Sequence, residues 1–313
     1  MPSEAIKTVP PAVPSEFWNE SLEHLFAGRA ATGMRIAGDE LQRIRERLTE
    51  PEWHAYTQTL YGSLYHRNYH QDPFTSRAYQ KPRGYAGDAV MIDMMYGSAS
   101  IPESTTPLGA TIYSATVAGP AGSSVKLRRD FLADYIDTSA DEFDHPDVLS
   151  VASGHLREGQ RCVSLGQGRL KRIVALDQDV LSLAVVESEQ AHLGVTTMHG
   201  SIRNLLNGSL RLEQFDVIYA SGLYDYLPAP LASRLTHVLF SSLNRGGKLL
   251  IPNFAPELVD IGYMEAVMDW WLVYRSEAHM CELAANLPAD EVSACRTFRD
   301  NQGYIVYLEV RRS

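Results

Sequence analysis

Residues 147–179, DVLSVASGHLREGQRCVSLGQGRLKRIVALDQD, decide the fold that this chain is expected to adopt. The apolar run 148–152 predicts a strand buried in a parallel sheet, and it ends at a turn in which Gly154 lets a ligand approach main-chain N–H groups. A second apolar run, 172–176, ends in Asp177. In a nucleoside-binding βαβ unit the acid that holds the ribose lies about 20 residues beyond the glycine turn, as Asp177 does here. The stretch therefore predicts a strand, a turn, a helix and a second strand around a nucleoside.

The rest of the sequence continues this alternation of strands and helices. Short apolar runs predict further strands, and amphipathic stretches between them predict helices. This order is typical of a doubly wound α/β sheet, whose ligands bind beyond the carboxyl ends of the strands. Five residues fall at such ends: Ser153, Gly154, Asp177, Ser201 and Ser221. The further strands are expected at residues 195–200, 215–220, 248–254, 296–299 and 304–310, the last two as an antiparallel pair.

The N-terminal part of the chain has helical periodicity and no strand alternation. Residues 1–14 are rich in proline and are expected to be a tail, followed by Ser15 as a helix N-cap. Residues 15–143 are expected to form a helical subdomain, within which the small and polar residues 97–124 predict a long irregular connection. Residues 144–313 are expected to form the sheet domain.

Two further segments of the sheet domain have clear local patterns. Residues 264–287, which include Arg275, have the spacing of a helix. Gly246 and Gly247 follow an amphipathic stretch and are expected to end its helix as a C-cap.

The segment 79–88, YQKPRGYAGD, is a candidate for contact with a ligand. Its glycines permit close approach, while tyrosine and arginine offer a stacking face and a fork that fits a carboxylate. Two interpretations are open: a turn that enters a helix with Asp88 as its cap, and a lid that closes over a bound ligand. The second makes Tyr79, Arg83 and Tyr85 site residues.

The overall composition argues against several classes of function. The net charge is −10 and the pI is near 5.5, whereas a nucleic-acid groove needs concentrated lysine and arginine. No stretch approaches the roughly 20 apolar residues of a membrane span. The start is acidic and rich in proline, unlike a secretory signal, so a cytoplasmic location is expected. The three cysteines and the pair His66 and His70 lack a complete metal-site pattern. We therefore expect unpaired thiols, packing histidines and no metal, nucleic-acid or membrane partner.

The order of these pieces resembles the class I S-adenosylmethionine (SAM)-dependent methyltransferases from about residue 144 to the C-terminus. The glycine turn, the acid after the second strand, FDVIYASGLYDYLP (215–228) and NRGGKLLI (244–251) take the places that the family pattern has for them. The RGYAGD, SVASG, GLYDYLP and DWWLVYR segments are similar to a bacterial subgroup with a helical N-terminal extension. That subgroup is associated with small-molecule and fatty-acid-derived methylation and is similar to enzymes that cyclise SAM to azetidine-2-carboxylate.

The resemblance implies a Rossmann-like doubly wound seven-stranded methyltransferase sheet with an N-terminal helical lid subdomain. It implies SAM as cofactor or substrate and a small-molecule partner. Asp177 would take the ribose hydroxyls by charge-assisted hydrogen bonds, and the main chain at Ser153 and Gly154 would approach the ligand. The other implied contacts are Gln178, Ser201 and Ile202 beside adenine, and Ser221 beside the methionine portion. The sequence departs from the family pattern at Ser150 and Ser201, which replace acids, and at Ala152 and Leu156, which replace glycines.

The chemistry of SAM adds candidates for catalysis. SAM is a sulfonium cation with a neutral leaving group, so an in-line attack needs positioning more than acid assistance. Tyrosine rings can hold the cation, and a tyrosine hydroxyl or a carboxylate can accept a proton. The candidate catalytic residues are Tyr85, Tyr224, Asp225 and Tyr226, while Arg83 and Arg275 are candidates for holding a carboxylate.

Three outcomes are open at this point. Methyl transfer to a small acceptor is the expected reaction. The alternative is intramolecular cyclisation of SAM to azetidine-2-carboxylate and methylthioadenosine, which requires a neutral amine. Because a nearby carboxylate would stabilise the ammonium, Ser150 in place of an acid favours this alternative. The third outcome is a protein that binds SAM or a nucleotide without turnover.

Overall fold

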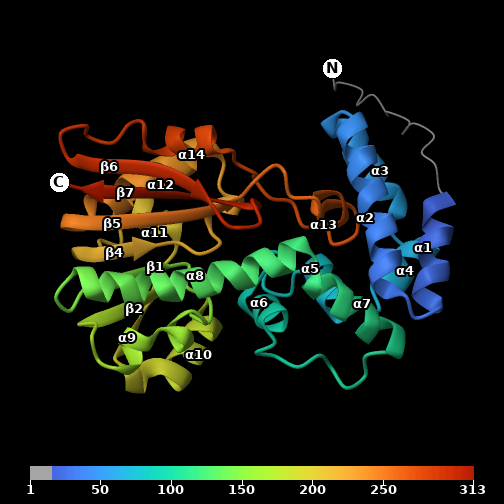
Figure 1. Cartoon of the computed structure of the whole chain (residues 1–313), viewed down its shortest axis with the longest axis horizontal. Coiled ribbons are helices and arrows are strands. Elements are labelled where there is room, and N and C mark those ends of the chain that lie inside the picture. Colours follow the sequence, from blue (N-terminus) through green and yellow to red (C-terminus); the bar gives the residue numbers. More distant parts are fainter. Residues whose placement is uncertain (1–15) are drawn as a thin grey trace. The chain divides into compact units, whose positions relative to one another are not determined.

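A computed structural model describes residues 16–313, and contacts within the chain divide it into two compact units (Figure 1). The helical unit comprises the described residues up to Ser123 together with Leu258–Trp271. The sheet unit comprises Ser124–Glu257 and Leu272–Ser313. The expected tail 1–14 and the expected N-cap at Ser15 lie outside the described residues. The expected domains, 15–143 and 144–313, stay a prediction that limited proteolysis would test.

The sheet unit contains a seven-stranded mixed sheet in the order β3-β2-β1-β4-β5-β7-β6. Strands β1 to β5 are parallel, and β7 and β6 are antiparallel additions at the edge beside β5. The predicted strands and the Rossmann-like α/β fold class are confirmed. The strand bounds are β1 Asp147–Val151, β2 Arg172–Asp177, β3 Val195–His199, β4 Phe215–Tyr219, β5 Leu243–Phe254, β6 Val292–Arg299 and β7 Ile305–Arg312.

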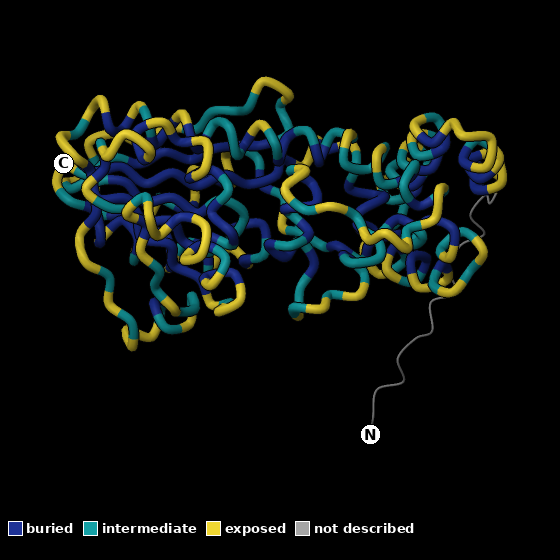
Figure 2. Tube along the Cα trace, turned by 90° about the horizontal axis from the view of Figure 1, so that it is seen from below, coloured by how far each residue is buried: buried dark blue, intermediate teal, exposed yellow. Residues whose placement is uncertain are grey.

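Helices cover both faces of this sheet, because its central strands are apolar on both sides. Along β7, Val306, Leu308 and Val310 belong to the apolar core that also includes residues of α12 (Ala229–Ser241) and α14 (Glu277–Ala284). The alternate residue Tyr307 points to the other face, where its ring lies 4.6 Å from that of Phe131 on α8 (Pro120–Glu142). In Figure 2 the strands form the buried interior of this unit. The remaining helices of the unit are α9 Val163–Gly166, α10 Val180–Gln190 and α11 Ile202–Leu206, with short 3-10 turns η1 Gly159–Arg161, η2 Ala191–Leu193 and η3 Tyr224–Tyr226.

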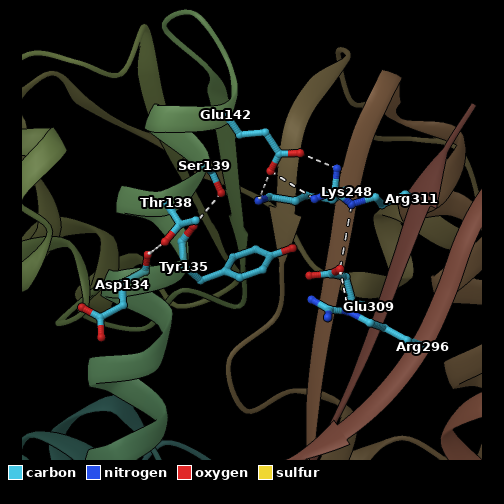
Figure 3. A network of polar contacts seen from close by, with 9 residues as sticks. All are labelled: Asp134, Tyr135, Thr138, Ser139, Glu142, Lys248, Arg296, Glu309 and Arg311. Atoms are coloured by element: carbon cyan, nitrogen blue, oxygen red, sulfur yellow. Dashed lines mark hydrogen bonds and ion pairs between the residues drawn. The ribbon is translucent and has the colours of Figure 1, made fainter.

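A network of ion pairs fastens the C-terminal end of α8 to the sheet (Figure 3). Glu142 accepts a hydrogen bond of 2.8 Å from Lys248 on β5 and two hydrogen bonds from Arg311 on β7. The hydrogen bonds from Arg311 are the main reason why the pKa of Glu142 is lowered to about 2. The ammonium of the buried Lys248 lies 4.4 Å from the centre of the Tyr135 ring, which adds a cation–π contact. Glu309 continues the network by accepting a 3.0 Å hydrogen bond from Arg296.

The helical unit is built from helices around an apolar interior in which a buried carboxylate is paired with an arginine. Glu265 is buried and accepts hydrogen bonds from Arg45 at 2.5 Å and from the indole of Trp53 at 2.8 Å. Among residues 16–313, none of the helices combines the length and the apolar character that a membrane span requires. The helices of this unit are α1 Glu16–Phe26, α2 Ala30–Arg47, α3 Glu50–Leu60, α4 Leu64–Tyr69, α5 Pro73–Gln80, α6 Ala89–Tyr96, α7 Pro107–Ala118 and α13 Ile261–Ala266.

The prediction of a long irregular connection over residues 97–124 is wrong. Helix α7 occupies Pro107–Ala118, and α8 begins at Pro120. The Oγ1 atom of Thr106 accepts a 3.0 Å hydrogen bond from the N–H of Gly109, and proline stands at the first helical position. The N-cap and the proline therefore start a helix, although the small residues that follow are typical of a loop.

Two other expected helix features are also corrected. The region between α13 and α14 is not helical, because its main chain bonds to other elements: the N–H of Val273 donates to the carbonyl of Asp225 at 2.7 Å, and the N–H of Arg275 donates to that of Phe254 at 2.9 Å. Gly246 and Gly247 do not cap α12, which ends at Ser241. They lie within β5 at a register shift beside β4, where Gly246 adopts a φ of +80°.

Candidate functional site

The candidate site lies at the carboxyl ends of β1, β2, β3 and β4, inside the sheet unit. Main-chain hydrogen bonds join the loops that leave these strands. The N–H of Ser153 donates to the carbonyl of Leu176 at 3.1 Å, and the N–H of Gly200 donates to the carbonyl of Asp177 at 3.0 Å. These bonds join the ends of β1, β2 and β3 in one rim, and β4 ends beside β1 as its parallel neighbour.

Asp177 is the central acceptor of this rim. Its Oδ2 accepts a 2.8 Å hydrogen bond from the N–H of Gly154, and its Oδ1 accepts one of 2.8 Å from the N–H of Asp179. Burial raises the pKa of Asp177, and these two hydrogen bonds oppose that rise. Each carboxylate oxygen has a second lone pair, so the carboxylate retains capacity to accept two hydroxyl groups. The structure thus brings together the two residues on which the nucleoside hypothesis depends.

The loop after β1 has the backbone of a glycine-rich turn although it contains little glycine. Ala152, Gly154 and Leu156 have φ values of +53°, +54° and +51°, which is the left-handed region. This conformation costs a residue with a side chain about 1–2 kcal/mol. Gln190 of α10 supports the loop by donating hydrogen bonds of 3.1 Å to the carbonyls of His155 and Leu156. Ala152 and Leu156 therefore have the backbone conformation that glycine adopts most readily.

The helix expected between the first two strands is much shorter than predicted. Only the 3-10 turn η1 and the single turn α9 lie between β1 and β2. The left-handed residues of the turn delay a right-handed start until after Leu156, and Gly168, with a φ of +67°, ends the segment soon afterwards.

The residues expected beside adenine occupy different surroundings. Gln178 is exposed, whereas Ser201, Ile202 and Ser221 are partly buried. The hydroxyl of Ser201 caps α11: it donates to Asn204 Oδ1 at 2.6 Å and accepts from the N–H of Asn204 at 3.3 Å. Their contacts with adenine or methionine stay a prediction.

A buried carboxylate that the sequence analysis missed lies in the loop after β1 and contacts the end of β4. Glu158 is 4% exposed, and its Oε1 accepts a 2.8 Å hydrogen bond from the hydroxyl of Tyr219. Burial raises the pKa of Glu158. Tyr219 is the register partner of Ser150, where the family pattern has an acid. Glu158 therefore provides a carboxyl group near that position from the loop after β1.

The adjacent residues Tyr224 and Asp225 have separate roles. Tyr224 is fully buried in the apolar core, with its hydroxyl 3.1 Å from that of Thr236. Its ring therefore packs in the core, and its catalytic role stays a prediction. Asp225 is also buried, accepts a 2.8 Å hydrogen bond from the N–H of Phe254, and has its pKa raised by burial to about 6. Tyr226 is partly buried and stays a catalytic prediction.

Arg275 does not have the contacts of a ligand-binding arginine. It is 3% exposed and donates 2.7 Å hydrogen bonds to the carbonyl of Tyr224 and to Asn253 Oδ1, as well as a hydrogen bond to the carbonyl of Leu227. The guanidinium group of Arg275 therefore stabilises the main chain around η3. The prediction that it holds a substrate carboxylate is not supported by these contacts and stays a prediction.

Tyr79, Arg83 and Tyr85 belong to the helical unit. Tyr79 packs edge-on against the stacked rings of His66 and His70, whose centres are 3.7 Å apart. Within residues 16–313 no group of three or more His, Cys, Asp or Glu side chains could hold a metal ion. The role of these three residues at a ligand stays a prediction.

Asp88 caps α6, as one interpretation of the YQKPRGYAGD segment predicted. It accepts a 2.9 Å hydrogen bond from the N–H of Met91 and hydrogen bonds of 2.9 and 2.7 Å from Arg77. The cap interpretation of Asp88 is confirmed, and the lid interpretation of its neighbours stays a prediction.

Comparison with solved structures shows that the fold is shared. A possible exported protein from Bordetella parapertussis is 15% identical, with 93% of this chain and 98% of that chain covered and a TM-score of 0.59. Magnesium protoporphyrin IX methyltransferase (ChlM) from Synechocystis with bound SAH is 14% identical, with 77% of this chain and 100% of that chain covered and a TM-score of 0.48. The N-methyltransferase NodS from Bradyrhizobium japonicum is 12% identical, with coverage of 60% and 97% and a TM-score of 0.42. No protein-family model and no curated protein matches the chain. At sequence identities this low, the comparison shows a shared fold and does not assign an activity to this chain.

Proposed function

We propose that this chain binds SAM at the carboxyl ends of β1 to β4 and transfers its methyl group to a small acceptor. The observation that carries the proposal is the contact between Asp177 and Gly154, because it joins a ribose acceptor to a main-chain turn at the point where doubly wound sheets bind nucleosides. The left-handed turn at Ala152 and Leu156 supports it, since the backbone retains the shape that the family sequence pattern implies.

The chain's own residues would act mainly by positioning. Asp177 would hold the ribose, and Ser221 at the end of β4 would lie beside the methionine portion. An attack in line with the departing thioether requires that the acceptor be held at the methyl carbon. Tyr85, Asp225 and Tyr226 remain candidates for holding the sulfonium or accepting a proton from the acceptor.

Cyclisation of SAM is the second candidate reaction. It requires the amine of the same molecule to attack its own γ-carbon, which breaks the bond to sulfur and releases methylthioadenosine. Ser150 on β1 favours this reaction, whereas the buried Glu158 nearby disfavours it when ionised, because it would stabilise the ammonium. A SAM-binding protein without turnover is the third candidate.

The three candidates differ in the thioether that accumulates. The protein would be incubated with SAM alone and then with SAM and a mixture of small acceptors, and the adenosine products separated. S-adenosylhomocysteine formed only with an acceptor supports methyl transfer, and methylthioadenosine formed without one supports cyclisation. Intact SAM that nevertheless binds supports the third candidate. Absence of any SAM or S-adenosylhomocysteine binding contradicts the proposal.

The proposal includes a small-molecule partner and a cytoplasmic location. The acidic composition supports a small-molecule partner over a nucleic acid. The cytoplasmic location is supported by the cysteines, none of which forms a disulfide within the described residues.

A further inference from the structure

Arg128 is a buried arginine beside the candidate site. Part of the hydrogen-bonding capacity of its guanidinium group is not satisfied. It is 4% exposed, and within residues 16–313 its Nε and Nη1 atoms have no hydrogen-bond acceptor. Its ion pair with Asp225 joins Nη1 to Oδ2 at 3.7 Å, which is longer than a hydrogen bond. Buried charged donors without acceptors are costly, so such a group calls for a specific reason.

The position of the guanidinium indicates what that reason is. Arg128 comes from α8, and its Nη2 lies 3.3 Å from the point where a Cβ on Gly222 would stand. Gly222 follows Ser221 in the loop that leaves β4, so the guanidinium lies against the carboxyl end of that strand. The ring of Phe254 lies 5.8 Å from the guanidinium carbon and forms an apolar wall beside it.

The contacts of Arg128 differ from those of Arg275, an arginine that supports the fold. Both arginines are buried near Asp225, but Arg275 donates to Tyr224, Leu227 and Asn253, as a structural arginine does. Within residues 16–313, Arg128 has no acceptor at Nε or Nη1. It meets Asp225 only at 3.7 Å, and the Oδ1 of Asp225 is already used by the N–H of Phe254. The charge of the buried Glu158 also acts on it, without a hydrogen bond to those two atoms. Its planar fork fits a carboxylate by two parallel hydrogen bonds.

We propose that Arg128 is a ligand-binding residue that holds a carboxylate group at the carboxyl end of β4. This inference rests on the proposed function for its site and extends it to the chemistry of the ligand. The carboxylate has two available sources: the amino-acid portion of SAM, and the acceptor. Gly222 keeps the approach to Nη2 open, because a side chain there would press on the guanidinium.

The experiment compares wild type with Arg128→Met, which keeps the length of the side chain and removes its charge. Calorimetry would measure binding of S-adenosylhomocysteine, which has the carboxylate, and of methylthioadenosine, which lacks the whole amino-acid portion. If the ligand's own carboxylate is held, Arg128→Met weakens S-adenosylhomocysteine roughly ten- to a hundredfold and leaves methylthioadenosine unchanged. Arg161→Met is the matched control, since Arg161 forms an exposed pair with Asp130 and should leave both affinities unchanged.

A second arm tests the acceptor. Thermal stabilisation of the protein by acetate, butyrate and octanoate would be compared with that by the matching amides, with and without S-adenosylhomocysteine. If an acceptor carboxylate is held, wild type responds to an acid and not to its amide, and Arg128→Met responds to neither. Should Arg128→Met fail to fold, Arg128→Lys keeps a positive charge beside Asp225 but lacks the planar fork, and the same losses are expected of it in weaker form.

A folded Arg128 variant that matches wild type with both nucleosides and with every acid contradicts the inference. So does a wild type that distinguishes neither S-adenosylhomocysteine from methylthioadenosine nor acids from amides. If wild type binds no nucleoside, the proposed function fails, and the acid and amide comparison then tests Arg128 by itself.

Discussion

The hydroxyl of Tyr219, at the end of β4, donates a 2.8 Å hydrogen bond to the carboxyl group of Glu158, in the loop after β1. Both residues are buried, and Tyr219 and Ser150 occupy paired positions on neighbouring strands. The contact ties together the two strand ends between which the sheet order reverses, and that reversal is where ligands bind in doubly wound folds.

Removing this hydroxyl should destabilise the sheet unit in a way that depends on pH. Tyr219→Phe leaves a buried carboxyl without its donor, at a cost of about 1–3 kcal/mol. Burial raises the pKa of Glu158, and the bond from Tyr219 partly offsets the rise. Since the folded protein then holds the proton longer than the unfolded chain, stability falls as pH rises above the ordinary glutamate range. The deficit in urea unfolding should be larger at pH 8 than at pH 5, and an equal deficit at both would contradict this account.

Asp177→Asn should weaken binding of S-adenosylhomocysteine by roughly tenfold or more, because the ribose loses charge-assisted hydrogen bonds. Calorimetry would measure the affinity. Asp179→Ala is a suitable control: the side chain of Asp179 caps α10 through the N–H of Leu181, and its substitution leaves its own N–H available to Asp177. Similar losses in the two variants would argue against a ribose contact at Asp177.

The two neighbouring tyrosines should behave differently. Tyr224→Ala removes a core ring and is expected to cost about 3–5 kcal/mol, whereas Tyr224→Phe keeps the ring and should leave turnover of SAM unchanged. Tyr226→Phe and Tyr85→Phe should lower turnover if their hydroxyls act in catalysis. Product formation and denaturant unfolding would be measured on the same preparations. Loss of turnover in a stable Tyr224→Phe protein would support the predicted catalytic role of that hydroxyl.

The network around Glu142 should contribute stability that disappears in acid. Its pKa is lowered to about 2, so the unfolded chain binds more protons between about pH 2 and pH 4.5, and the contribution is lost as pH falls through that window. Because Glu142 is about one-third exposed, Glu142→Gln is expected to cost only about 1–2 kcal/mol at pH 7. The difference from wild type should shrink below pH 3. Asp141→Asn, at an exposed pair with Arg169, should have little effect at any pH.

Ala152→Gly should stabilise the protein by about 0.5–1 kcal/mol. Glycine removes the steric penalty of a left-handed residue, although it also increases the freedom of the unfolded chain. Ala133→Gly, in the interior of α8, is the opposite control and should cost about 1 kcal/mol. Thermal unfolding would measure both. A destabilised Ala152→Gly protein would show that the methyl group contributes more than the backbone strain costs.

The strands could be predicted from the sequence because buried parallel strands are short apolar runs with a polar residue at the end. The contact between Gly154 and Asp177 could be predicted because the glycine turn and the acid have the spacing of a nucleoside-binding βαβ unit. The different contacts of Tyr224 and Asp225 could not be predicted, since the 3-10 turn that contains both has no periodic signal. Arg275 appeared helical by spacing, but main-chain bonds to Asp225 and Phe254 hold that segment outside a helix.

Arg128 and Glu158 escaped prediction for a different reason. Arg128 stands beside Arg129 in a charged, amphipathic helix, where an arginine is ordinarily solvated. Its burial arises only when α8 packs near Gly222 and Asp225, which are distant in sequence. Glu158 likewise follows another charged residue in a loop, and only the fold brings Tyr219 to it.

The loop after β1 is braced from outside by Gln190, two of whose contacts are with main-chain carbonyls. A turn braced in this way can exchange the residues that compose it while its outline persists. Relatives of this protein should therefore be recognisable by an amide side chain at the end of the helix after β2, even where every glycine of the turn has been lost.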